Sequence, residues 1–175
     1  MKSKKRYFAF ILRFFLLFFL IVSPIACKTM QFGWKGTIAR PESRVLFKEG
    51  GAHRGFLKTA DLVVEYEYTR NPDNMLLSGY VQLDDSLRYN YELVDFFFLT
   101  INFLKGDGTV IERQTAMIFM STEPIESKWR FERTFEIPPQ TAAFAFSYKG
   151  RVLEKGQDNG GDWNFYLNPL QKPGK

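Results

Sequence analysis

The stretch FFFLTINFLKGDGTVIERQTAM, residues 96–117, decides the fold of this chain. Its first part, 96–104, is apolar on both sides and has the length of a strand, which predicts a central strand of a sheet. Residues 105–108 predict a tight hairpin turn, because glycine adopts the positive φ angles that such turns require. Residues 109–117 are then expected to return as the antiparallel partner. An antiparallel hairpin therefore stands at the centre of the predicted fold.

Further strands are expected on both sides of this hairpin. Residues 61–69 and 129–137 alternate between apolar and polar side chains, as strands with one wet face do. Residues 75–83 predict another strand, with a bulge at Gly79. The remaining expected strands cover residues 34–39, 44–48, 141–153 and 163–167.

Residues 84–95 allow two interpretations. Asp84, Asp85 and Ser86 are good caps for a short helical turn that would run through residue 91. Alternatively, the segment simply connects two sheets, and we favour this connection.

The pattern as a whole predicts an all-β protein. Seven to nine strands with hairpin turns and no convincing amphipathic helix favour a β-sandwich of immunoglobulin-like or fibronectin-like architecture over residues 34–167. A closed barrel of lipocalin type is the alternative, and residues 168–175 are expected to form a frayed C-terminal tail. Residues 79–152 weakly resemble small extracytoplasmic bacterial sandwich modules, which share no chemistry, so the resemblance implies no functional residue.

The N-terminal residues have the three-part layout of a secretory signal. Five basic residues precede an apolar core at 14–22, and this core has the length of a signal rather than of a membrane span. The neck Ser23-Pro24-Ile25-Ala26-Cys27 resembles the lipobox of bacterial lipoprotein precursors. The resemblance implies cleavage after Ala26 and diacylation of Cys27, the single cysteine of the chain, although Pro24 stands where the family usually has an aliphatic residue.

This resemblance also implies an address. It divides the chain into an apolar signal helix at 1–26, a lipidated tether at 27–33 and the β domain. Lys28 occupies the position at which an Asp commonly retains lipoproteins at the inner membrane, so the outer membrane, facing the periplasm, is favoured. An uncleaved N-terminal anchor and a soluble exported binding protein are the alternatives.

Charge excludes nucleic acid as a partner. The chain holds 24 Lys and Arg and 19 Asp and Glu, but residues 1–26 contain five of the basic residues and none of the acidic ones. The remainder is therefore balanced at 19 of each sign. Binding to nucleic acid requires clustered basic residues that release counterions, and a balanced domain has no net preference for it.

No catalytic or cofactor-binding set is recognisable. His53 is the only histidine and is expected in an exposed, Gly-rich loop, and with Cys27 lipidated no nucleophile–base pair is left. Asp84 with Asp85, or residues 158–162, could hold calcium, but turn chemistry explains the same residues. Glu65 and Glu67 are expected on a solvated strand face rather than as a catalytic carboxylate pair.

The aromatic residues carry the one signal for binding. Trp129 and Tyr148 alternate with polar residues and are expected in the core. Trp163 and Tyr166 are separated by an odd number of positions and lie on opposite faces of the expected strand, so one of them should face outward as a contact for a glycan or an envelope protein. The sequence thus predicts a membrane-anchored lipoprotein with a binding or scaffolding domain, no enzymatic activity and no cofactor. A carrier of small apolar ligands, of closed-barrel type, is the rival hypothesis.

Overall fold

The computed structural model describes residues 34, 36–120, 122–125, 128–154 and 161–172. The chain divides into two units, Met1–Trp34 and Lys35–Lys175, and the elements below belong to the second. The predicted signal helix, the cleavage point, Cys27 and the tether lie outside the described residues. Within the described part, no helix is long and apolar enough to cross a membrane.

Strands dominate the described part of the chain, which confirms the predicted all-β class. Eight strands have six or more residues: β3 (Ala52–Lys58), β4 (Leu62–Arg70), β5 (Asn74–Leu83), β6 (Leu93–Leu104), β7 (Val110–Phe119), β9 (Trp129–Glu136), β10 (Ala143–Leu153) and β11 (Asp162–Leu167). The short strands are β1 (Ile38–Ala39), β2 (Val45–Leu46), β8 (Glu123–Pro124) and β12 (Leu170–Gln171). The helical elements are η1 (Pro41–Ser43) and α2 (Asp85–Asn90).

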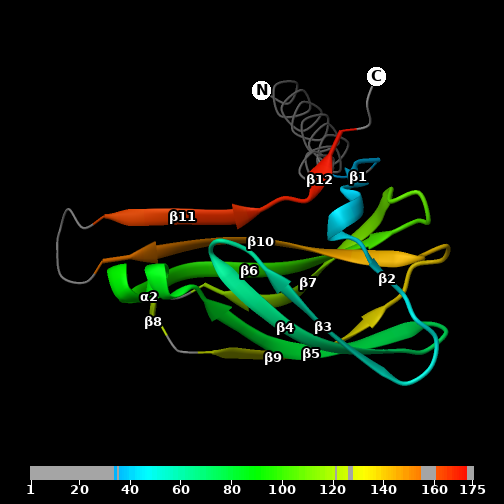
Figure 1. Cartoon of the computed structure of the whole chain (residues 1–175), viewed down its shortest axis with the longest axis horizontal. Coiled ribbons are helices and arrows are strands. Elements are labelled where there is room, and N and C mark those ends of the chain that lie inside the picture. Colours follow the sequence, from blue (N-terminus) through cyan, green and yellow to red (C-terminus); the bar gives the residue numbers. More distant parts are fainter. Residues whose placement is uncertain (1–33, 35, 121, 126–127, 155–160, 173–175) are drawn as a thin grey trace, which may run out of the picture. The chain divides into compact units, whose positions relative to one another are not determined.

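The strands form two large antiparallel sheets and one small one (Figure 1). The four-stranded sheet has the order β3-β4-β5-β9, and the six-stranded sheet has the order β11-β10-β6-β7, with β2 added to β10 and β8 added to β6. The strands β1 and β12 pair with each other. None of these sheets closes on itself, so the alternative of a closed barrel does not describe this part of the chain.

The two large sheets face each other across a single aromatic core. Ring contacts join them at three places along the layers: Tyr66 with Phe146 at 5.0 Å, Phe97 with Trp129 at 5.4 Å and Phe103 with Phe135 at 6.2 Å between centroids. Full burial of such a side chain contributes about 1.5–3 kcal/mol. The interior of the described part is therefore filled by side chains, as the alternation in 61–69 and 129–137 predicts.

The central hairpin is confirmed. β6 lies between β10 and β7, and the turn is closed by hydrogen bonds from Lys105 N to Thr109 O and from Gly108 N to Lys105 O, both at 2.9 Å. Gly108 has a φ of +91°, which explains the glycine at this position. The strands run further than expected, since β6 begins at Leu93 and β7 ends at Phe119.

Several local predictions are wrong. Residues Asp85–Asn90 are helical: the segment does connect the two large sheets, as favoured, but through helix α2, which the Asp84 side chain caps. Gly79 forms no bulge, because its pairing with Tyr66 and Phe131 keeps the register. The strand expected at 34–39 is present only as β1.

The prediction for His53 is also wrong. His53 belongs to β3, a strand that the sequence pattern did not reveal, and its side chain is half-buried against Tyr68, with ring centroids 5.3 Å apart. At the other end of the chain, two residues of the expected tail form β12.

Candidate functional site

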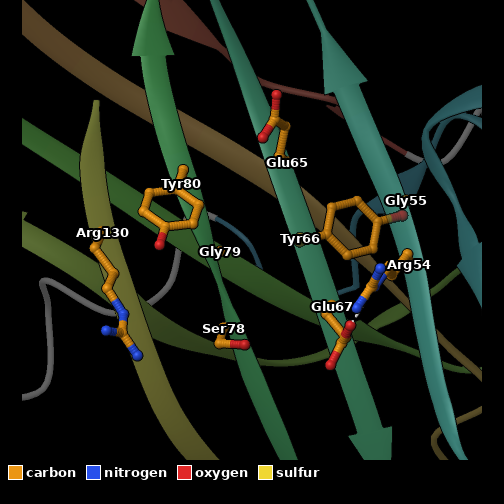
Figure 2. Close-up of a pocket in the computed structure, with 9 residues that line it drawn as sticks. All are labelled: Arg54, Gly55, Glu65, Tyr66, Glu67, Ser78, Gly79, Tyr80 and Arg130. Carbon is orange, nitrogen blue, oxygen red and sulfur yellow. Dashed lines mark hydrogen bonds and ion pairs between the residues drawn. The ribbon is translucent and has the colours of Figure 1, made fainter. Parts of the chain in front are cut away.

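A hollow of about 400 Å³ lies on the outer face of the four-stranded sheet (Figure 2). Residues whose side chains alternate with the core positions provide its walls. One row of cross-strand neighbours runs over all four strands, and the next row lies beside it. The two rows are Phe56–Glu65–Tyr80–Arg130 and Arg54–Glu67–Ser78–Glu132.

Each charge in this first hollow has a partner. Arg54 forms an ion pair with Glu67, and this hydrogen bond raises the pKa of the guanidinium. Arg130 Nη2 lies 2.9 Å from Glu132 Oε2. Lys128 Nζ lies 3.4 Å from Glu65 Oε2 and 5.9 Å from the centre of the Tyr80 ring.

The carboxylates of Glu65 and Glu67 thus belong to a solvated, charge-paired sheet face, as predicted. Two aromatic side chains stand among these ion pairs: Phe56 is 73% exposed and Tyr80 is 43% exposed. Sequence reasoning missed Phe56 because β3 was not recognised as a strand.

A second hollow, of about 440 Å³, lies on the outer face of the six-stranded sheet. Its lining residues come from three neighbouring rows of cross-strand pairs and from the end of β11. In order along the strands, these rows are Ile118–Phe98–Lys149–Tyr166, Thr115–Thr100–Ser147 and Arg113–Asn102–Ala145. Asn168, just after β11, completes the wall.

A buried amide supports this floor. Asn102 is fully buried, and its Nδ2 donates to Ala145 O and to Ser147 Oγ, both at 3.1 Å. Arg113 Nη2 also donates to Ser147 Oγ, at 3.4 Å. The buried Asn102 Oδ1 has no hydrogen-bond partner within the structure.

The charges of the second hollow differ from those of the first. Its lining includes Arg113 and Lys149 but no acidic side chain among the described residues. Arg113 is exposed at its rim, yet desolvation by the surrounding side chains lowers the pKa of its guanidinium. Within the described residues, neither Arg113 nor Lys149 forms an ion pair. The second hollow is therefore a positively charged surface, although residues 27–175 contain equal numbers of basic and acidic residues.

The two predicted contact residues lie apart. Trp163 is 52% exposed and Tyr166 is 71% exposed, but they occupy opposite faces of β11. Tyr166 lines the second hollow, and Trp163 does not. Trp129 and Tyr148 are buried, as predicted. Whether Trp163 or Tyr166 contacts a partner stays a prediction.

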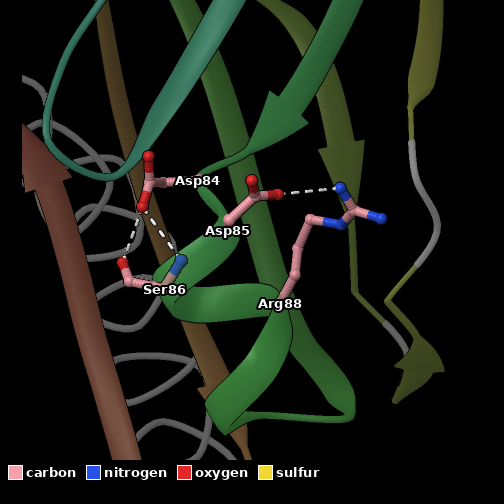
Figure 3. A network of polar contacts seen from close by, with 4 residues as sticks. All are labelled: Asp84, Asp85, Ser86 and Arg88. Carbon is pink, nitrogen blue, oxygen red and sulfur yellow. Dashed lines mark hydrogen bonds and ion pairs between the residues drawn. The ribbon is translucent and has the colours of Figure 1, made fainter.

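The first calcium candidate is engaged in local contacts (Figure 3). Asp84 Oδ1 accepts hydrogen bonds from Ser86 N at 2.9 Å and Ser86 Oγ at 2.7 Å, which lower the pKa of the carboxyl group. Asp85 forms an ion pair of 3.1 Å with Arg88. Capping of α2 therefore accounts for the Asp84 carboxylate, and the ion pair with Arg88 accounts for that of Asp85.

Most of the second calcium candidate, residues 158–162, lies outside the described part. Of its two carboxylates only that of Asp162 is described, and it lies 3.7 Å from Arg151 Nη1. Among the described residues, no group of three or more His, Cys, Asp or Glu side chains could hold a metal ion.

A comparison with known protein families, with curated proteins and with solved structures found no match.

Proposed function

We propose that this chain is a bacterial envelope lipoprotein, anchored through a diacylated Cys27, whose β domain binds another component of the envelope and catalyses no reaction. One observation carries the proposal: the single cysteine of the chain follows a basic head, a short apolar core and the short neck 23–26. Two acyl chains give stable attachment to a membrane, because each buried methylene contributes about 0.8 kcal/mol.

The strand order supports a fibronectin-like or immunoglobulin-like type for the domain. Such folds place strands A, B and E in one sheet and C, F and G in the other. With β4, β5 and β9 taken as A, B and E, the strands β6, β10 and β11 stand in the places of C, F and G. Domains of this architecture present their outer faces and loops to partners.

The packing favours surface binding over the rival carrier hypothesis. A carrier of apolar ligands needs a hollow interior, whereas Phe97, Phe103 and Phe135 are fully buried between the two sheets. The first and the second hollow lie instead on the outer faces of the sheets, and both are lined by aromatic and charged side chains.

The anchor is tested by mass spectrometry of the protein purified from membranes. We expect an N-terminal peptide that begins with acylated Cys27, and we expect Cys27→Ala to abolish acylation and membrane attachment. Thr29→Ala, two residues further on, is the matched control and should remain lipidated. An unmodified mature terminus elsewhere in the chain would contradict the proposal.

The address is tested separately. In a host with two membranes, we expect density fractionation to find the protein in the outer membrane. Lys28→Asp should move most of it to the inner membrane, whereas Lys28→Ser should not. Equal distributions of the two variants would show that residue 28 does not decide the destination.

A further inference from the structure

We propose that the second hollow, on the outer face of the six-stranded sheet, binds an anionic saccharide: a sugar ring that carries a carboxylate or a phosphate. This inference names the ligand class of the binding domain. It rests on the binding half of the proposed function and not on the lipid anchor.

The first argument is the isolation of two cations. Elsewhere on the outer faces, three arginines form ion pairs: Arg151 pairs with Asp95, and Arg54 and Arg130 each pair with a glutamate. In the second hollow, Arg113 and Lys149 form no ion pair with any carboxylate of the described residues. The Arg113 guanidinium reaches only a serine hydroxyl, and the Lys149 ammonium lies 5.6 Å from the centre of the Phe96 ring. An anion placed between these two cations would receive charge-assisted hydrogen bonds.

The second argument is the direction of the Ser147 hydroxyl. Ala145 O can only accept, so the Asn102 amide must turn its Nδ2 toward Ala145 O, and this nitrogen then also donates to Ser147 Oγ. Ser147 Oγ accepts a second hydrogen bond from Arg113. Because both contacts are donated to the oxygen, the hydroxyl hydrogen of Ser147 remains for an acceptor in the hollow.

The orientation of the Asn102 amide leaves its Oδ1 without a hydrogen-bond partner among the described residues. Leaving a buried acceptor such as Asn102 Oδ1 without a partner is energetically unfavourable. The same amide sets the direction of Ser147 at the floor of the hollow. Ser147 and Arg113 therefore present donors side by side, and Lys149 adds a second cation to the lining of the same hollow.

The third argument is the aromatic wall. Phe98 and Tyr166 lie in the same row as Lys149, on either side of it, and Tyr166 is 71% exposed. Exposed rings give a flat apolar surface against which a sugar ring can pack, while a free inorganic anion gains nothing from them. A volume of about 440 Å³ exceeds what a bare anion needs. Two cations next to exposed aromatic rings, in a hollow of this size, favour a ligand in which an anionic group is attached to a sugar ring.

Isothermal titration calorimetry on the purified full-length protein tests the site. The probes are glucuronate, glucose 6-phosphate, neutral glucose and inorganic phosphate. We expect at least one of the two anionic sugars to bind at least tenfold more tightly than both glucose and inorganic phosphate, and to bind more weakly as salt is added. The comparison of glucuronate with glucose 6-phosphate identifies the charged group. The proposal is overturned if neither anionic sugar binds more tightly than glucose and inorganic phosphate.

Substitutions place the ligand in the hollow. Arg113→Gln and Lys149→Gln should each weaken binding of the anionic sugar about tenfold, because each removes one charge-assisted contact. Tyr166→Ala should weaken it through loss of the ring contact. Arg130→Gln, on the outer face of the opposite sheet, is the matched control and should bind as the unsubstituted protein does.

The result separates this proposal from the lipid anchor. Unlipidated Cys27→Ala protein should still bind the anionic sugar. Failure to bind, or binding unchanged by Arg113→Gln and Lys149→Gln, overturns the saccharide site alone. Failure of acylation overturns the anchor alone.

Discussion

Two glycines decide how an aromatic side chain fits between three strands. Tyr66 pairs with Gly55 on one side and with Gly79 on the other. The Tyr66 ring lies over Gly55, where an added Cβ would come within 2.4 Å of the phenol oxygen (Figure 2). Glycine inside a strand often marks such a close approach rather than a turn.

Gly79→Ala is expected to destabilise the protein by about 1–3 kcal/mol or more. Its Cβ would lie 2.1 Å from the backbone oxygen of Glu65, and a main-chain atom within a sheet cannot move aside as a flexible side chain can. Urea unfolding followed by tryptophan fluorescence measures the loss. Gly106→Ala is the control: no atom lies within 4 Å of its Cβ, so its midpoint should hardly change. Equal midpoints for the two variants would show that β4 and β5 can shift apart.

The prediction of a bulge at Gly79 failed for a physical reason. A glycine within an alternating strand is compatible with either a bulge or a close contact, and only the partner strand distinguishes them. Tyr66 lies thirteen positions earlier in the chain, and its role becomes visible only once the strands are paired. The pairing of Gly79 with Tyr66 thus decides between a bulge and a regular strand, which the sequence around Gly79 does not.

At the scale of elements, predictions succeeded where large side chains carry the pattern. The β6–β7 hairpin was recognisable because its central strand is apolar on both faces and its turn contains two glycines. β3 was missed because its inward positions are His53, Gly55 and Leu57, of which only the last is an apolar side chain. Phe56, the most hydrophobic-looking residue of β3, faces solvent. Side chains of β3 therefore do alternate between the two faces, but a large aromatic residue lies on the exposed face and residues without large apolar side chains lie on the inner one.

Helix α2 depends on its cap. Asp84→Ala should lower the melting temperature by a few degrees, because it removes the acceptor for Ser86 N, whereas Asp84→Ser should retain most of the stability. The pKa of Asp84 is lowered in the folded protein, so its stabilising effect is present above about pH 4 and is lost as the pH falls through the lowered pKa. The difference between Asp84→Ala and the unsubstituted protein should shrink accordingly in acid. Asp85→Ala, which removes only an exposed ion pair, is the control and should have little effect.

At the scale of the whole molecule, contacts between side chains and backbone join the two sheets at their edges. Gln114 Nε2 on β7 donates to Glu136 O on β9 at 3.0 Å, and Arg133 Nη1 on β9 donates to Thr115 O on β7 at 2.6 Å. Arg133 interrupts the apolar face of its strand in the sequence. The alternation places Arg133 on the inner face of β9 without explaining why an arginine stands there. The hydrogen bond to Thr115 O on the opposite sheet explains it.

Charge is also arranged at this scale. Counting residues gives the net charge, but it could not show that Arg54, Arg130 and Arg151 form ion pairs while Arg113 and Lys149 form none with any described residue. Pairing depends on which strands become neighbours. The first hollow and the second hollow therefore differ in charge although they belong to the same domain.

Tyr148 ties the six-stranded sheet to the turn between β3 and β4. Its hydroxyl donates to Asp61 Oδ2 at 2.9 Å and contacts Thr59 Oγ1 at 2.7 Å. Tyr148→Phe should cost about 1 kcal/mol near neutral pH.

Burial raises the pKa of Tyr148, so above about pH 10 the unfolded chain releases a proton that the folded chain keeps, and stability falls as the pH rises. Urea midpoints between pH 8 and 11 should therefore decline less steeply in Tyr148→Phe than in the unsubstituted protein. Tyr89→Phe, at an 86% exposed position, is the control and should keep the original slope. If Tyr148→Phe keeps that slope as well, ionisation of Tyr148 does not drive alkaline unfolding.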